Sequence, residues 1–394
     1  MPEYLPDRYN PEMYKDQGYM ETEEILFNMV AEIESVYSIA YYEMLAKAKR
    51  YLAWFTVLDK SRKKMVEDQL MDEEDYKTWR RTQLMLGRNS YAMVQTLADN
   101  LTAVDEIAAS VINGYMPEVF AINGNWTEYV ISRDIKANVG FTLYDEQTMV
   151  RLMRDKPDLL PKARINIPKD VQWNKEKLNS AIAQGILQGE TTDEIAKRLA
   201  QVTDMDMNSA VRNAATMVTS AQNGGRMDAI HRAEDMGIPT KKKWIATLDG
   251  HTRPTHRKAD GEIVATDAKF SNGLLYPGDP NGTPAEVYNC RCVLSAFVDK
   301  QLNLLTDRDL RPLNRWDMTY DQWKAANGGE PIFKAARNVN RNYDMHEEYM
   351  SLLGKKVPSN FNDFERFKYE QPEEWRKMVS EARKERNRRR KAAS

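Results

Sequence analysis

The sequence feature that most constrains the fold is a run of apolar residues spaced by four and three near the start of the chain. After Thr22 this spacing places apolar side chains at Ile25, Met29, Ile33, Val36, Ala40 and Met44. Such a period is one face of an α-helix, and we predict a long amphipathic helix that runs to about Phe55. An apolar stripe has to be buried against another element, so we expect helical packing partners.

Two further helices follow in the same part of the chain. One begins at the acidic cluster 72–75, whose charge suits a helix N-terminus, and it ends near Gly87. The other covers about 90–112. Together these helices predict an N-terminal helical hairpin or bundle over 21–112. The preceding residues 1–20 contain three prolines and show no period, so we expect an extended arm there.

The rest of the chain divides by its pattern into four regions. Glycines and prolines predict a connector with short helices over 113–172, and the helical period returns over 173–240 as central helices. Turn residues between short apolar runs predict a loop and strand module over 241–299. A helical region with a basic tail follows over 300–394. The residues that interrupt helices in the connector are Gly114, Pro117, Gly124, Gly140, Pro157, Pro161 and Pro168. For the whole chain we predict a mainly α fold with a small α+β module.

The length and the charge distribution bound the kinds of partner. A chain of 394 residues is long enough for two or three domains. Its 57 Lys+Arg against 59 Asp+Glu exclude a protein that binds polyanions over its whole surface. The C-terminal end is basic, and it holds Arg383, Lys384, Arg386, Arg388, Arg389, Arg390 and Lys391. Such a tail could neutralise DNA phosphates; a solvated helix end and a portal-binding arm are the alternatives.

The sequence also bears on the compartment. No apolar run approaches the roughly 20 residues that a membrane span needs, and the first residues lack the order of a signal peptide. We expect a soluble protein made in the cytosol, with no membrane partner. Two cysteines separated by one residue cannot build a disulfide framework, which fits a reducing compartment.

Polar and turn-forming residues are concentrated in one stretch of the predicted module. The run reads W-x-A-T-x-D-G-x-T-R-x-x-H-x-x-x-D-G, then F-S-N-G, Y-P-G-D-P and P-A-E-x-x-N-C-R-C. Its singled-out residues are Trp244, Asp249, Thr252, Arg253, His256, Asp260, Gly261, Asn272, Gly273, Pro277, Asp279, Glu286, Asn289, Cys290, Arg291 and Cys292. This run resembles the signature of the phage Mu F-like minor head proteins, a family of phage head morphogenesis proteins.

The resemblance extends to the helix before the module. That helix carries Arg212, Thr216, Thr219, Asn223, Gly225 and Arg226, and the resemblance therefore covers at least 174–298. One departure is His251, at a position where family members often have Arg. The side chains of the helix share one face because they are spaced by three and four. That face is either solvated or packed on the module, with Arg226 or Arg253 paired to Asp249 or Glu286.

The resemblance implies a structural protein of a tailed-phage head. It implies a few copies inside the prohead near the portal, with a role in head assembly and in DNA packaging or ejection. The implied partners are the portal protein, a scaffold or major capsid protein, and packaged DNA. The implied location is the interior of the virion head, after assembly in the host cytoplasm.

The sharpest chemical hypothesis is a zinc site. His256, Cys290 and Cys292 are donors that Zn²⁺ prefers, and Asp249, His251 or Asp279 could supply a fourth ligand. However, a C-x-C pair in a strand points its thiols to opposite faces. The sequence therefore favours the other interpretation, in which no cofactor is bound, the cysteines are small buried groups, and the polar side chains hydrogen-bond loop backbone.

Catalysis has less support in the sequence, and we expect no enzyme. A His-Asn-His nuclease would need a later ligand histidine within the module, and after His256 the chain has only His346. A cysteine hydrolase could pair Cys290 with His256, oriented by Asn289 or Asp249, but no Gly-rich oxyanion loop accompanies them. No nucleotide-binding glycine motif is present either. The alternative function is a metal-binding or hydrolytic module carried into the head as cargo.

Overall fold

The computed structural model describes residues 10–136, 140–164, 166–298, 318–328, 345–358 and 372–393, together with 364 and 367. Its contacts divide the chain into two units, Met1–Pro331 and Ile332–Ser394. The described residues form helices and one small antiparallel sheet, so the prediction of a mainly α fold with a small α+β module is confirmed.

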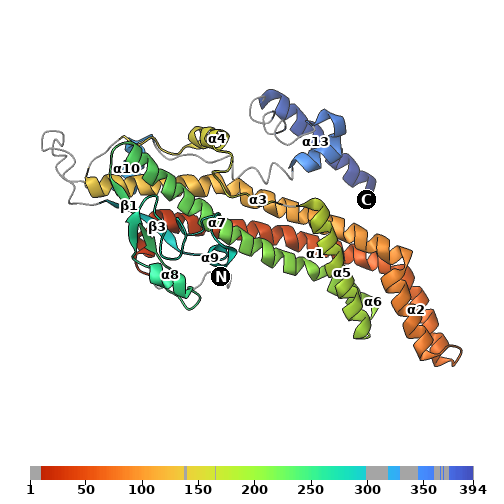
Figure 1. Ribbon diagram of the computed structural model, residues 1–394. Helices are drawn as coiled ribbons and strands as arrows, with labels where there is room; N and C mark the ends of the chain where they lie inside the picture. The colour runs from red at the N-terminus through yellow and green to blue at the C-terminus, as the bar shows by residue number, and fades with distance from the viewer. Residues whose placement is uncertain are drawn as a thin grey trace, which may run out of the picture. The chain divides into compact units, whose positions relative to one another are not determined.

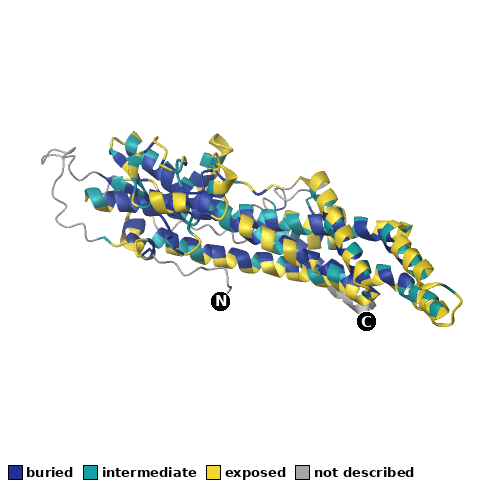
Figure 2. Cartoon of the chain, turned by 60° about the horizontal axis from the view of Figure 1, so that its bottom comes forward, coloured by how far each residue is buried: buried dark blue, intermediate teal, exposed yellow. Residues whose placement is uncertain are grey.

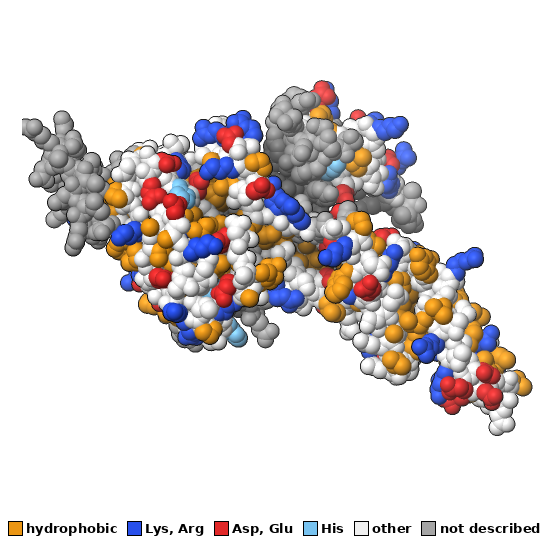
Figure 3. All heavy atoms as spheres, in the orientation of Figure 1, with side chains coloured by type: hydrophobic (Ala, Val, Ile, Leu, Met, Phe, Trp, Pro, Cys, Tyr) orange, Lys and Arg blue, Asp and Glu red, His pale blue; other side chains and the backbone are white. Residues whose placement is uncertain are grey.

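Three long helices form the framework of the first unit (Figure 1). They are α1 (Gln17–Glu67), α3 (Arg88–Ile135) and α7 (Val202–Asp235), and each packs against the other two. The predicted apolar stripe of α1 is buried, except that Tyr37 takes the place of Val36 in the core. The helix continues past the predicted end at Phe55. The next helix, α2 (Glu73–Leu86), has the predicted bounds and begins with three acidic residues, which are gathered at one tip of the first unit in Figure 3.

The predicted connector is wrong over 113–135, because α3 continues through it with Pro117 inside the helix. The stretch is buried on nearly every side, as Figure 2 shows, so packing between α1 and α7 outweighs the local cost of the breakers. Gly124 is a packing residue: a Cβ there would lie 2.6 Å from the ring of Tyr144. The side chain of Asn113 also fastens this region, since its amide bonds both the N–H and the carbonyl of Ala163.

The predicted extended arm is also wrong where it is described. A 3₁₀-helix, η1, covers Met13–Lys15, and α1 already begins at Gln17, with the carboxylate of Asp16 accepting from the backbone N–H of Tyr19. Met13 is fully buried in a cluster with Tyr19 and two residues of the sheet. The segment around Met13 therefore packs on the sheet of the module. Residues 1–9 of the predicted arm lie outside the described part.

Shorter helices complete the middle of the chain. They are α4 (Glu146–Asp155), α5 (Ile167–Leu187) and α6 (Thr192–Ala200). The helix α4 is the one short helix of the predicted connector that the described residues contain. Between α5 and α6, Gly189 has a φ of +71°, and Thr191 forms a capping box with Glu194 at the start of α6.

The module is built on a sheet of three antiparallel strands in the order β2-β1-β3. The strands are β1 (Thr240–Ile245), β2 (Ile263–Ala265) and β3 (Val293–Val298). In the register, Lys243 faces Ile263 on one side of β1, and Trp244 faces Leu294 on the other. Two short helices, α8 (Pro254–Ala259) and α9 (Pro284–Val287), lie in the loops between strands. All three strands fall within 240–298, which agrees with the predicted loop and strand module over 241–299 to within a residue.

The C-terminal region contributes to both units. In the first unit, α10 (Tyr320–Ala326) packs Trp323 and Tyr320 against Tyr129 of α3. The second unit contains the helical residues 345–353, the 3₁₀-helix η2 (Gly354–Lys356) and α13 (Pro372–Ala393) around a small apolar core. The basic tail is part of α13. The side chains of Arg383, Arg386, Arg390 and Lys391 lie outside the described part, and among the described helices none is long and apolar enough to cross a membrane.

Candidate functional site

The polar face of α7 covers the open edge of the sheet at β3. Thr219 donates to the carbonyl of Cys290 at 2.7 Å. Asn223 donates to the carbonyl of Cys292 and accepts from the backbone N–H of Leu294, so its amide replaces a neighbouring strand. Of the two interpretations of this face, the structure shows the packed one from Thr216 to Arg226, whereas Arg212 is exposed. A helix that satisfies the backbone groups of an edge strand also protects that edge from other chains.

Arg226 extends the same face and joins three parts of the chain. Its guanidinium donates to the carbonyl of Leu294 at 3.0 Å, to the side-chain oxygen of Asn123 on α3, and to both carboxylate oxygens of Asp16. The Arg226 side chain is 1% exposed. The pairing expected between Arg226 and Asp249 or Glu286 is therefore wrong, and the true partner, Asp16, comes from the segment that was predicted as an arm.

Asp249 organises the loop after β1. It forms a two-pronged ion pair with Arg291, and it accepts from the hydroxyl of Thr252 and from the backbone N–H of His251. Burial opposes ionisation of this carboxyl, but the hydrogen bonds from Arg291 and Thr252 outweigh it and lower the pKa of Asp249. The loop also needs one residue of positive φ, which is Leu248 at 61°.

Other predicted residues of the module also hold backbone in place. Asp260 accepts from the N–H of Ala246. Asp279 accepts from the N–H groups of Leu275 and Asn281. The guanidinium of Arg253 donates to the carbonyl of Tyr288, and neither Asp249 nor Glu286 is its partner. Two turn positions conform to the motif: Gly261 has a φ of 75°, and Gly273 has a φ of 82°.

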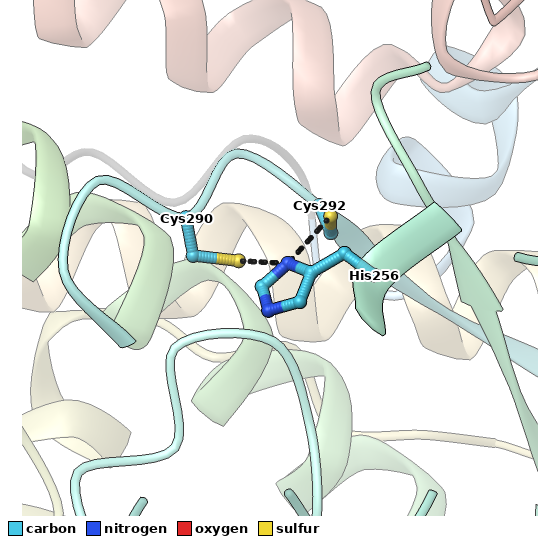
Figure 4. Close-up of side chains that lie close together, drawn as sticks. All are labelled: His256, Cys290 and Cys292. Carbon is cyan, nitrogen blue, oxygen red and sulfur yellow. Dashed lines mark hydrogen bonds between the residues drawn. The ribbon is translucent and has the colours of Figure 1, made fainter. Parts of the chain in front are cut away.

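His256, Cys290 and Cys292 meet in the interior of the module (Figure 4). The Nδ1 atom of His256 lies 3.5 Å from Sγ of Cys292 and 3.7 Å from Sγ of Cys290. The three donor atoms all lie within 4.8 Å of one another, and the residues are 1%, 1% and 2% exposed. The fold thus gathers the three side chains that the sequence singled out as metal donors.

The backbone before β3 explains how two thiols separated by one residue face the same ring. Cys290 and Cys292 precede the strand, which begins at Val293, and Asn289 has a φ of 56°. Alternation of side chains between two faces is a property of extended strands and does not apply to this turn. The two thiols therefore do not point to opposite faces, as expected for a strand, and both face His256.

The surroundings orient the imidazole. Nε2 of His256 lies 2.9 Å from a carboxylate oxygen of Glu286, although the two are not aligned as a hydrogen bond, and the ring packs edge-on against Trp244. A hydrogen bond between the two thiols, Cys290 and Cys292, raises the pKa of Cys290, and burial raises it further. The same hydrogen bond, helped by His256, lowers the pKa of Cys292, so Cys292 is the thiol that ionises first.

The arrangement limits what chemistry the cluster can perform. Among the described residues, no acidic or histidine side chain joins the three donors: Asp249 and Asp279 bond loop backbone and Arg291, and His251 is exposed. A nucleophilic cysteine has to meet substrate, and both thiols are buried. The geometry therefore suits a structural ligand set better than a catalytic pair.

Comparison with known proteins shows which family the module resembles. Residues 176–295 match the profile of the family described as "Phage Mu protein F like protein". Over 219 residues the chain is 26% identical to the minor head protein GP7 of Bacillus phage SPP1. This alignment covers 53% of this chain and 68% of that protein. Over 153 residues the chain is 31% identical to the NAD(+)--arginine ADP-ribosyltransferase EFV of Enterococcus faecalis. This second alignment covers 38% of this chain.

The matches differ in how much of each relative they cover. This chain spans only 31% of the length of the enterococcal protein, and 64% of the uncharacterized protein YqbB of Bacillus subtilis at 25% identity. No solved structure matches the chain. The matched segment begins in α5 and ends in β3, so it contains the polar face of α7, the Asp249 loop and the three buried donors. Residues 176–295 of this chain are accordingly similar to the phage Mu protein F-like family.

Proposed function

We propose that this chain is a minor head protein of a tailed bacteriophage and that it acts as a structural protein in head morphogenesis. The observation that carries the proposal is the family match over residues 176–295, supported by the likeness to the SPP1 minor head protein. The buried polar network of the module serves folding in this proposal. The network joins Asp16, α3, α7 and the sheet into one body.

We further propose where the protein acts and what it contacts. The chain sits inside the head near the portal, and its partners are the portal protein and a scaffold or major capsid protein. It joins the prohead in the host cytoplasm and assists DNA packaging or ejection. Pull-down of the portal protein by the full-length chain tests the first contact, with the purified major capsid protein as the parallel bait. Retention of neither protein would contradict this placement.

The head role is tested in the phage that encodes the chain. Removing the gene should lower the yield of DNA-filled heads seen by electron microscopy, and supplying the chain from a plasmid should restore it. Mass spectrometry of purified proheads should detect the protein. Normal heads without the gene, combined with absence of the protein from proheads, would refute the proposal.

The second part of the proposal is that the C-terminal half of α13 contacts packaged DNA. Lys384, Arg388 and Arg389 are exposed on this helix, while Met378 and Ala382 anchor its first half in the core of the second unit. Removing 383–394 therefore spares the anchor. Basic side chains bind phosphates without sequence preference and release counterions, which makes binding depend on salt.

The DNA contact is tested by measuring affinity for duplex DNA against salt. Replacing Lys384, Arg388 and Arg389 by Gln should weaken binding and reduce the slope of log K against log salt by about 0.9 for each phosphate that is no longer neutralised. The matched control replaces Lys60, Lys63 and Lys64, exposed basic residues of α1, by Gln. Equal loss of affinity in both variants, or no salt-sensitive binding by the full-length chain, would give the tail another role.

One relative is named as an enzyme, an arginine ADP-ribosyltransferase, so ADP-ribosyl transfer is the activity to test in this chain. The matched part leaves most of the enterococcal ADP-ribosyltransferase outside this chain, so we propose that the shared segment is the head module and carries no transferase activity. Incubation with labelled NAD⁺ and an arginine-rich acceptor should transfer no ADP-ribose. Transfer that depends on the intact chain would show that it is an enzyme.

A further inference from the structure

We propose that His256, Cys290 and Cys292 bind one Zn²⁺ ion, which fastens α8 to the turn before β3. The three donors come from two segments that are 34 and 36 residues apart in sequence, and they converge in the interior of the module. Imidazole nitrogen and thiolate sulfur are the ligand atoms that zinc prefers in structural sites. The inference concerns the folded module alone, so it does not depend on the role in the phage head.

Hydrogen bonds alone hold this cluster only weakly. The Nδ1 atom has one lone pair or one proton, so it can make one good hydrogen bond, yet two thiols lie at nearly equal distances from it. The cluster is buried, and the second thiol is left to bond the first, although a thiol is only a weak donor and a weak acceptor. A single cation at the centre satisfies all three donors at once, and two thiolates neutralise its charge.

The two nitrogen-to-sulfur distances match those around a tetrahedral zinc ion. Zn–S bonds of about 2.3 Å and Zn–N bonds of about 2.0–2.1 Å at a tetrahedral angle separate the sulfur and nitrogen atoms by about 3.6 Å. The two separations in the structure are 3.5 Å and 3.7 Å. The ring and the thiols therefore need little movement to close around the ion.

The groups behind the ligands also fit a zinc site. A zinc-bound histidine usually directs its other ring nitrogen to a carboxylate, and Glu286 lies 2.9 Å from Nε2 of His256. The hydroxyl of Thr255 holds the same carboxylate oxygen of Glu286 at 2.9 Å. On the thiol side, Thr219 and Asn223 bond the carbonyls of both cysteines. Every ligand is thus held by a second group.

The fourth position of the tetrahedron is assigned to a water molecule. Among the described residues no fourth cysteine, histidine or carboxylate joins the group. Asp249, the fourth ligand considered from sequence, is committed to Arg291 and Thr252. An open position is the pattern of catalytic zinc, but the burial of all three ligands keeps substrates away and leaves the ion a structural role.

The test begins with the full-length chain, stripped of metal under reducing conditions and then incubated with Zn²⁺. After removal of free metal, elemental analysis should find about one zinc per chain. Loading with Co²⁺ instead should give a thiolate-to-cobalt absorption band, which reports the two thiolates without any substitution. Chelation should lower the melting temperature of the zinc-loaded protein. Failure of the reduced chain to retain zinc would overturn the proposal.

Variants then locate the site. Cys290→Ser and Cys292→Ser should each lose zinc, and His251→Ala, which changes an exposed histidine of the same module, should retain it. Because a ligand variant could misfold, Glu286→Gln provides a milder change: we expect the zinc affinity to fall about 10-fold to 100-fold in competition with a chelator. A variant that carries both serine substitutions should bind no zinc. If it retains as much zinc as the natural chain, or if His251→Ala loses as much as the cysteine variants, the ion lies elsewhere.

Discussion

Arg226 and Asp16 lie 210 residues apart in sequence and form a buried two-pronged ion pair, with N···O distances of 2.5 and 2.7 Å. The pair ties the start of α1 to the centre of α7, next to the sheet edge. A planar guanidinium and a carboxylate make two parallel hydrogen bonds in this arrangement, and the geometry is specific as well as strong.

Breaking this pair should destabilise the first unit strongly. Asp16→Ala leaves the Arg226 charge buried without its counter-ion, so we expect the free energy of unfolding in urea to fall by about 3–5 kcal/mol. Glu12→Ala is the control: it removes the exposed ion pair with Lys243 and should cost less than about 1 kcal/mol. If the two variants lose similar amounts of unfolding free energy, the buried pair contributes no more to stability than the exposed one.

Two adjacent glycines of α7 should respond in opposite directions to alanine. A Cβ on Gly225 would lie 2.1 Å from the carbonyl oxygen of Phe120 on α3, so Gly225→Ala forces the helices apart and should cost about 1–3 kcal/mol. A Cβ on Gly224 would meet only the Phe120 ring, at 3.6 Å. Gly224→Ala should stabilise the protein by up to about 1 kcal/mol through helix propensity. Thermal unfolding of both variants checks the sign of each stability change. Stabilisation by both substitutions would contradict the close approach of α7 to α3 at Gly225.

The loop after β1 should depend on two side chains that hold backbone. Asp249→Ala removes the partner of Arg291, and Arg253→Ala removes the donor to the carbonyl of Tyr288. We expect each substitution to lower the melting temperature, with a cost of about 1–3 kcal/mol for Asp249→Ala. His251→Ala in the same loop serves as the exposed control. Unchanged melting of both Asp249→Ala and Arg253→Ala would refute their role.

Lys242 on β1 should make stability depend on alkaline pH. Its side chain is fully buried, its Nζ has no hydrogen-bond partner among the described residues, and burial lowers the pKa of Lys242 to about 8. The unfolded chain has a Lys pKa of about 10.4, so it binds more protons between these values. Stability from this group should therefore rise as the pH increases from about 8 to 10.

Replacing the buried lysine tests this dependence. Lys242→Met should raise the melting temperature at pH 7 and flatten the rise between pH 8 and 10, because the cost of burying the charge is removed. Lys241→Met, at the exposed neighbouring position, should do neither. A steeper pH dependence in Lys242→Met than in the natural chain would contradict the assignment.

Local pattern was sufficient for some elements and misleading for others. The helical period located α1 and α2, and the run of turn-forming and polar residues in the module located the family segment. The breakers Pro117 and Gly124 predicted a connector, yet they lie inside α3. Propensity is a weak local preference, and the burial of α3 between two helices exceeds it.

The sequence by itself determined the periodic helices, the turn-rich module and the identity of its donor residues, because spacing and side-chain chemistry are local properties. Only the tertiary structure decided which partners meet. It paired Arg226 with Asp16, placed Asn223 against the edge of β3, and turned both thiols toward His256. These contacts join segments far apart in the chain, and they follow from the packing of helices on the sheet and from the positive φ at Asn289.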